Sequence, residues 1–342
     1  MISMRRHVNI PVFIPNLGCP HKCVFCDQRE ISGARFDISS VRRSISEALA
    51  TVEEDADCEI AFFGGSFTGI GIPLMTSLLD IAREFTDAGR VGSIRLSTRP
   101  DMIDDGILDI LSRYAVRTIE LGIQSMDDAV LEASRRGHTA AVSERACRMI
   151  KERGFGLAGQ MMTGLPGATP ESERMTAESI CRMGASAARI YPAVVLRGTE
   201  MERMAADGRY VPLTVGEAVS RSADLLEIFD RHGVKVLRVG LCASDGLSEG
   251  DAVGGAYHPA LGEMARGEVF RRRIDARLAE MGAGGGSGTV VVSVPRGAAS
   301  AATGQKRANA AALKSKFNIK TLKIIENPQL IGYNIDVSVS AP

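Results

Sequence analysis

Near its amino terminus the chain reads Asn16-Leu17-Gly18-Cys19-Pro20-His21-Lys22-Cys23-Val24-Phe25-Cys26-Asp27. Three of the seven cysteines fall here in a C-x3-C-x2-C pattern, with an aromatic residue just before the last. Thiolates are soft ligands that select iron–sulfur clusters, zinc or copper(I). A 4Fe–4S cluster usually takes four cysteines, and a closed zinc site also needs four ligands. The pattern therefore predicts either a fourth ligand from elsewhere in the chain or one metal position left open for chemistry.

The composition is that of an ordinary globular protein. The 342 residues are 45% hydrophobic and 24% charged, with a formal net charge of zero. This length suits an α/β barrel with a small extension. No apolar run approaches the ~20 residues of a membrane helix, and the basic start at residues 1–7 lacks a signal peptide's apolar segment. We therefore expect no membrane association and a cytoplasmic location, where cysteines serve metals more than disulfides.

Short apolar runs alternate with amphipathic stretches about six times in the first part of the chain. This alternation predicts an α/β fold with a parallel sheet covered by helices, either open and doubly wound or closed into a partial barrel. Strands are expected at 8–17, 59–63, 93–97, 118–123, 157–162 and 187–190. Helices are expected after a cap at Ser39 or Ser40, and at 73–88, 104–114, 127–135, 141–153 and 171–183.

After Tyr191 the pattern changes. A helix at 214–229, capped by Thr214, and one more strand at 234–241 complete a predicted core of residues 1–242. The predicted C-terminal module, residues 243–342, continues the loop expected at 240–255. It then contains a basic helix at 259–281, a Gly-rich hinge at 282–288, strands at 289–294 and 321–325, and a helix at 305–317 between these strands.

Polar or glycine-rich residues follow the carboxyl end of each predicted strand. Besides the cysteines they are Gly64-Gly65-Ser66, Ser97 with Arg99, Gln124, Gly164–Gly167 and Tyr191. Because parallel strands present these ends at one rim, where ligands bind, we expect the residues to share one site. Glycine lets backbone approach a ligand, and exposed carbonyls accept hydrogen bonds from an ammonium group.

The cysteine pattern, with Phe25 before the last cysteine, resembles the hallmark of the radical SAM superfamily. The resemblance implies a partial (β/α)6 TIM-type barrel with a small α+β C-terminal extension. It also implies that Cys19, Cys23 and Cys26 hold a 4Fe–4S cluster whose open iron binds S-adenosylmethionine (SAM). Reductive cleavage of SAM would then give a 5′-deoxyadenosyl radical that abstracts a substrate hydrogen, with a flavodoxin- or ferredoxin-type protein as reductant.

The same resemblance implies roles for other residues of the rim. Gly64, Gly65 and Ser66 are similar to the family's glycine motif, which contacts the methionine part of SAM. Phe25 is expected to pack on the adenine. The remaining SAM contacts are expected from Ser97, Gln124 and Arg136.

Further motifs resemble the radical SAM half of Elongator catalytic subunits, over about residues 10–240 and in the same order. That family modifies wobble uridine, so the resemblance implies transfer RNA as a partner. Its cysteine motif is more widely spaced, and no segment after Leu241 resembles its acetyltransferase domain, so the exact reaction does not carry over. The matching motifs are Gly64–Thr68, Thr98–Asp101, Glu120–Ser125, Arg136–Thr139, Gly164–Gly167, Ile190–Pro192 and Arg197–Glu200.

Two other functions remain open at this point. The oxygen-independent coproporphyrinogen oxidases share the fold and a similar glycine motif but match less of the chain, and a porphyrinogen-type small molecule is therefore one alternative substrate. A peptide is another. A non-enzymatic alternative is a zinc-stapled RNA-binding protein. The segment from Arg296 to Lys323 has seven basic and no acidic residues. Together with Arg271–Arg273 it is either a phosphate-contacting surface or an ordinary solvated helix face.

Overall fold

The computed structural model of the chain describes residues 7–14, 17–20, 22–26, 36–241, 250–283 and 288–340. His21, Cys242 and residues 284–287 of the expected Gly-rich hinge lie outside these ranges. Within them, no helix is long and apolar enough to cross a membrane.

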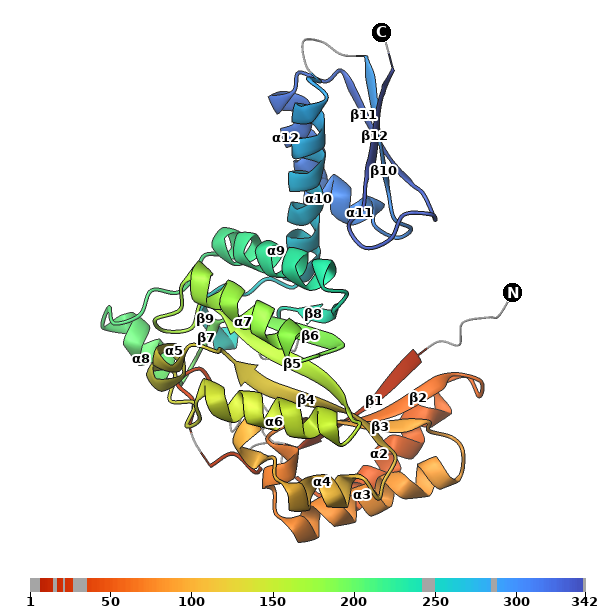
Figure 1. Ribbon diagram of the computed structural model, residues 1–342, viewed down its shortest axis with the longest axis vertical. Helices are drawn as coiled ribbons and strands as arrows, with labels where there is room; N and C mark the ends of the chain where they lie inside the picture. The colour runs from red at the N-terminus through yellow and green to blue at the C-terminus, as the bar shows by residue number, and fades with distance from the viewer. Residues whose placement is uncertain are drawn as a thin grey trace.

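A seven-stranded parallel sheet, curled into a half barrel, forms one half of the molecule, and the C-terminal elements extend away from it (Figure 1). The predicted partial barrel is confirmed, but it has seven strands rather than six, because β8 pairs parallel with β6. Each strand contributes its outward side chains to the main apolar core. In spatial order the strands are β1 (His7–Ile14), β2 (Asp57–Gly64), β3 (Ser93–Thr98), β4 (Val116–Gln124), β5 (Gly156–Thr163), β6 (Ala187–Pro192) and β8 (Lys235–Val239).

Helices cover the outer face of the half barrel and close this core. In the first of them, the buried Val41, Ile45 and Leu49 recur every fourth residue, which makes one apolar stripe. Its cap is Asp37, whose carboxylate accepts a hydrogen bond from Ser39 N at 2.9 Å. The expected cap at Ser39 or Ser40 is therefore wrong by two or three residues. The helices are α2 (Ile38–Ala50), α3 (Ile72–Asp87), α4 (Asp105–Leu111), α6 (Ala140–Glu152), α7 (Pro170–Arg182) and α9 (Val215–Arg231).

Three short elements near the rim were not predicted. They are α8 (Glu200–Ala206), β7 (Val194–Leu196) and β9 (Ala252–Gly255). The segment expected as a loop at 240–255 therefore contains a strand, and β9 pairs antiparallel with β7. A fourth short element, α5 (Asp128–Ala133), lies within the helix expected at 127–135. Figure 1 shows α5 and α8 at the same end of the half barrel.

The C-terminal residues build a second, smaller apolar core. Its sheet has the order β11-β10-β12, with β10 parallel to β11 and antiparallel to β12. The strands expected at 289–294 and 321–325 are confirmed, whereas the expected helix at 305–317 is shorter and follows an unpredicted one. The elements are α10 (Leu261–Glu280), β10 (Thr289–Val294), α11 (Ala299–Thr303), α12 (Ala308–Lys316), β11 (Thr321–Glu326) and β12 (Asp336–Ser340).

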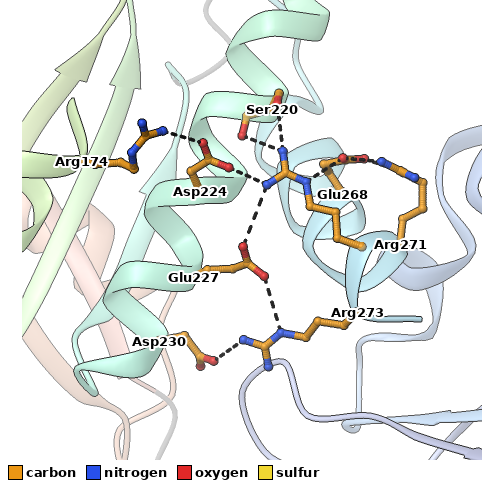
Figure 2. Close-up of polar contacts among 9 residues, drawn as sticks. Arg174, Ser220, Asp224, Glu227, Asp230, Glu268, Arg271 and Arg273 are labelled. Atoms are coloured by element: carbon orange, nitrogen blue, oxygen red, sulfur yellow. Dashed lines mark hydrogen bonds and ion pairs between the residues drawn. The ribbon is translucent and has the colours of Figure 1, made fainter. Parts of the chain in front are cut away.

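A network of ion pairs joins α10 to α9 (Figure 2). Arg272 donates to Glu268 at 2.9 Å and to Ser220 Oγ at 2.8 Å, and it also pairs with Asp224. Arg273 donates to Asp230 at 3.1 Å. Arg271 is bound to Glu268 at 2.6 Å. One of the two alternatives for these three guanidiniums was a phosphate-contacting surface. Each of them is instead paired with an acidic residue, and Arg272 and Arg273 pair across the α9–α10 interface.

Candidate functional site

The cysteine segment leaves β1 and lies directly on the glycine motif that follows β2. Gly65 N donates to Ile14 O at 2.7 Å, and Ser66 N donates to Leu17 O at 3.0 Å. A Cβ atom on Gly65 would lie 2.1 Å from Leu17 O, and one on Gly18 would lie 2.2 Å from Ser66 O. Only glycine fits where two backbones meet this closely. The glycine motif therefore seats the cysteine segment.

A second support comes from Val24, between the last two cysteines. Val24 is 1% exposed and packs with residues that include Met201 and Tyr210. Its N–H donates to Ser134 O at 3.1 Å, at the end of α5, and its carbonyl accepts from Met201 N at 2.8 Å, in α8. Phe25, expected at the adenine, is half-buried against this same cluster. The unpredicted α8 thus covers the cysteine segment. Its cap, Thr199 followed by Glu202, was a signal that sequence reasoning missed.

Two arginines converge on Cys23. The cysteine is 8% exposed, and its Sγ lies 3.5 Å from Arg136 Nη1 and 3.9 Å from Arg99 Nη1. Cys19 and Cys26 are exposed. Desolvation raises the pKa of Cys19, whereas the charges of Arg99 and Arg136 act in the opposite direction. The structure therefore brings Cys19 and Cys23 under the influence of the same two cations.

Both guanidiniums are fixed by further contacts. Arg99 is 2% exposed and donates to the carboxylate of Asp101 at 2.9 Å and to Arg136 O at 2.5 Å. Arg136 donates to Gly122 O at 2.6 Å. Burial raises the pKa of Asp101, but its hydrogen bonds and ion pair with Arg99 outweigh this and hold the pKa below its usual range. The cations are thus held in place before any ligand arrives.

Two polar atoms of the predicted SAM residues have no hydrogen-bond partner among the described residues. They are Gln124 Oε1 and Arg136 Nε, and both are buried. Gln124 ends β4 with a φ of 68°, a conformation that is uncommon outside glycine and that clusters at functional sites. A buried acceptor and a buried donor without partners are costly unless a ligand satisfies them.

Ser66 and Ser97 are placed differently from each other. Ser66 is completely buried, with its Oγ 2.9 Å from Thr98 Oγ1 and accepting from Arg99 N at 3.2 Å. It therefore ties the glycine motif to the end of β3. Ser97 lies on the inner face of the sheet, where its Oγ accepts from Gln160 Nε2 at 3.2 Å. The structure does not bring Ser97 into the group of contacts around Cys23.

The inner face around Ser97 carries a charged network that sequence reasoning missed. Arg95 donates to Glu59 at 2.7 Å and to Glu120 at 2.9 Å. Arg189 donates to Glu120 at 2.7 Å, and its guanidinium lies 5.5 Å from the ring centre of Phe63. Burial raises the pKa of Glu120, but its contacts, first of all with Arg189, outweigh this and lower it. The available signal was a charged residue within each of three apolar strands, Arg95 in β3, Glu120 in β4 and Arg189 in β6, on the face that alternates with the buried one.

The Gly164–Gly167 turn is held by the protein itself. Gly164 N donates to Glu173 Oε1 at 2.7 Å, and its carbonyl accepts from Tyr210 OH at 2.6 Å. Arg221 also pairs with Glu173 at 2.9 Å. These contacts give the turn a structural role in joining β5 to α7 and α9.

The donor set fits a cysteine-bound cluster with SAM. It combines soft thiols, fixed cations that offset thiolate charge, and unsatisfied polar atoms beside them. Among the described residues, no three His, Cys, Asp or Glu side chains are gathered closely enough to hold a metal ion, and this includes the three cysteines.

Comparison with known proteins agrees with this chemistry. The profile of the radical SAM superfamily matches residues 13–180, and that of the Radical_SAM C-terminal domain matches residues 185–271. The uncharacterized protein MJ0486 of Methanocaldococcus jannaschii is 31% identical over 234 residues, which are 64% of this chain and 70% of that protein.

Two other relatives are more distant. A tRNA uridine(34) acetyltransferase of Dehalococcoides mccartyi is 23% identical over 268 residues, 67% of this chain and 58% of that protein. The solved structure of Elp3 from the archaeon Methanocaldococcus infernus, lacking residues 1–46, superposes with a TM-score of 0.62 at 19% identity, over 82% of this chain and 64% of that one. This chain therefore spans less than two thirds of either protein, and the superposition supports the fold alone.

The chain belongs to the radical SAM superfamily, and it is an enzyme of that class. Membership implies a 4Fe–4S cluster and SAM as its cofactors.

Proposed function

We propose that Cys19, Cys23 and Cys26 hold the 4Fe–4S cluster and that SAM binds beside them. The observation that carries the proposal is the pair of buried guanidiniums on Cys23 Sγ. When bound, the cluster supplies the electron that splits SAM into methionine and a 5′-deoxyadenosyl radical, which takes a hydrogen atom from the substrate. A flavodoxin- or ferredoxin-type protein is the proposed reductant, in the cytoplasm.

The chain's own residues position these groups. Arg99 and Arg136 offset the negative charge of the thiolates and orient Cys23. Gly64, Gly65 and Ser66 hold the cysteine segment and present backbone groups to the methionine part of SAM. Gln124 Oε1 accepts a hydrogen bond from SAM, and Arg136 Nε donates one to SAM. Both buried atoms then have a partner. Phe25 contributes an apolar surface for the adenine. Ser97 would contact SAM only from the inner face of the sheet, where its Oγ accepts a hydrogen bond from Gln160.

We further propose transfer RNA as the substrate. The support is the match to a tRNA uridine(34) acetyltransferase over 67% of this chain, together with the motifs shared with Elongator catalytic subunits. The half barrel leaves β1 side chains of its inner face exposed, including Phe13, which offers an open approach for a large substrate.

The cofactor proposal is tested by anaerobic reconstitution with iron and sulfide. We expect a brown protein with about four irons per chain that forms 5′-deoxyadenosine from SAM when dithionite is added. One bound zinc and no 5′-deoxyadenosine would overturn it in favour of a structural zinc site.

The substrate proposal is tested separately. Nucleosides from the transfer RNA of a strain without this gene are compared with those of the parent strain. We expect one modified nucleoside to disappear and to return with the native gene but not with a Cys23→Ala copy. Identical nucleoside profiles would reject transfer RNA as substrate.

A further inference from the structure

The C-terminal module concentrates positive charge in a protein whose net charge is zero. Between Met281 and Ile325 there are seven basic residues and no acidic one. All seven are exposed. Lys316 pairs with Asp275 at 2.7 Å, and among the described residues none of the other six forms an ion pair. The others are Arg296, Lys306, Arg307, Lys314, Lys320 and Lys323. This differs from Arg271–Arg273, whose charges are neutralised by partners.

Two of these cations lie next to each other in a constrained loop. Residues 304–307, Gly-Gln-Lys-Arg, connect α11 to α12. The φ angles are 79° at Gly304, 50° at Lys306 and 65° at Arg307. Left-handed backbone is uncommon for a residue with a side chain, and two consecutive examples are costly. The loop thus presents Lys306 and Arg307 side by side at the start of α12.

The scaffold beneath this loop is tightly packed. Asn309 Nδ2 donates to Gly267 O at 2.9 Å and reaches Ala301 O at 3.4 Å, which joins α12 to α10 and α11. A Cβ atom on Gly304 would lie 2.8 Å from Asn309 N, and one on Gly267 would lie 2.6 Å from Ala301 O. The basic loop is therefore held by three helices, and its shape is set without a ligand.

The edge strand β11 supplies an apolar surface beside these helices. β11 contacts both α11 and α12 and pairs with β10 on one side only. Leu322 and Ile324 stand opposite the buried Val290 and Val292, so they point to the helix side of the sheet, yet they are only half-buried. Ile325, on the other face of this strand, is 47% exposed. Leu322 and Ile324 pack against the small C-terminal core, but part of each side chain stays accessible next to the exposed cations.

We propose that the Gly304–Arg307 loop, the start of α12 and β11 form a binding surface for single-stranded RNA. Lys306 and Arg307 contact successive phosphates, and unpaired bases pack on the half-buried Leu322 and Ile324. The arrangement resembles KH modules, in which a Gly-x-x-Gly loop clamps four backbone nucleotides. Here Arg307 occupies the position of the second glycine, with a φ that glycine adopts readily.

Single-stranded RNA fits these observations better than a duplex or an acidic protein. The partly exposed apolar side chains can pack on a base only where its face is unstacked and accessible. In a duplex the base faces are stacked and hidden. A single strand also follows a short loop with its phosphates while its bases turn toward the adjoining strand. This inference deepens the proposed function by naming how an RNA substrate is held, and it rests on that proposal for the choice of RNA.

The test measures the affinity for a fluorescently labelled, unstructured oligoribonucleotide of about 12 nucleotides. Binding is monitored by fluorescence anisotropy at several salt concentrations. The double variant Lys306→Asn/Arg307→Gly removes both charges with residues that accept left-handed backbone, so the module keeps its fold. We expect its affinity to fall about tenfold or more. The slope of log K against log salt should become flatter by about 1.4 for two lost phosphate contacts.

A matched control is Arg145→Gln/Arg148→Gln, which removes two exposed charges from α6 of the half barrel. This variant should bind like the native protein. Equal binding by the Lys306/Arg307 variant, or equal binding of a duplex of the same sequence, would overturn the proposal. Both variants should form 5′-deoxyadenosine at the native rate, so a failure here is distinct from a failure of the cofactor proposal.

Discussion

The inner face and rim of the half barrel differ from the basic segment Arg296–Lys323 of the C-terminal module in how they use their basic side chains. In the half barrel, Arg95, Arg99 and Arg189 are largely buried, and each is paired with a carboxylate at 2.7 to 2.9 Å. Arg136 is buried against Cys23 and a carbonyl. In the module, Lys306 and Arg307 are exposed and form no ion pair among the described residues.

The difference reflects the cost of desolvating a charge. A buried cation is tolerated only when its partners are well placed, so the half-barrel arginines are fixed parts of the site. An exposed cation keeps its water and gains most from an external anion, whose counterions are released on binding. The protein therefore places fixed charge where the chemistry is proposed and available charge where an RNA strand is proposed to bind.

The largest effect is expected at the cysteines. Replacing Cys19, Cys23 and Cys26 together with alanine removes every proposed thiolate ligand, so iron content and 5′-deoxyadenosine formation should both be lost. Iron and sulfide analysis with chromatography of the SAM products would measure this. Cys181→Ala, a half-buried cysteine of α7, is the control and should retain both. Retained iron in the triple variant would contradict the assignment.

The next effect is expected inside the half barrel. Glu120→Leu leaves Arg95 and Arg189 with one carboxylate fewer in a buried position. Removing one partner from a buried ion pair costs about 3–5 kcal/mol. Urea unfolding should therefore show a large fall in the free energy of unfolding. Glu84→Leu, which removes the exposed partner of Arg42, should leave stability nearly unchanged. If both variants lost a similar free energy of unfolding, the buried ion pairs would contribute no more to stability than the exposed pair.

A smaller effect is expected at Arg136. Arg136→Gln keeps a donor near Gly122 O but removes the positive charge beside Cys23. Groups that support metal ligands typically contribute about 10–100-fold to affinity or activity. We expect 5′-deoxyadenosine formation to fall within that range, with a change in the visible spectrum of the reconstituted protein. Arg135→Gln, the exposed neighbour, should behave like the native protein. Native activity in Arg136→Gln would contradict the role given to the two cations.

The smallest effect is expected in the module, and it has the opposite sign. Arg307→Gly relieves the left-handed backbone at φ 65° and should raise the free energy of unfolding by about 1 kcal/mol. Lys314→Gly, in the interior of α12, should lower it by about the same amount. Thermal unfolding of the two variants compares their stabilities. A rise for Arg307→Gly with a fall for Lys314→Gly would attribute the gain to relief of backbone strain and not to the loss of a cation. A destabilised Arg307→Gly would mean that this arginine is held by a structural contact.

Much of the fold follows from local patterns in the chain. The alternation of apolar strands and amphipathic helices predicted six of the seven strands of the half barrel, and the seventh was expected separately at 234–241. The short elements α8, β7 and β9 were missed, because three to seven residues are too few to show a period. The strands were also expected to be continuously apolar, so the ion pairs of Glu120 with Arg95 and Arg189 on the inner face were not predicted.

The sequence by itself determined the kind of chemistry. Three closely spaced cysteines supply soft metal ligands in any packing. The glycines and polar residues at the strand ends lie at the same rim, because parallel strands end together. Only the tertiary structure decided which cations serve them. Arg136 and Cys23 are 113 positions apart, yet their contact is 3.5 Å. Which distant charges meet depends on how loops pack on one another, and desolvation then decides which of them must be paired.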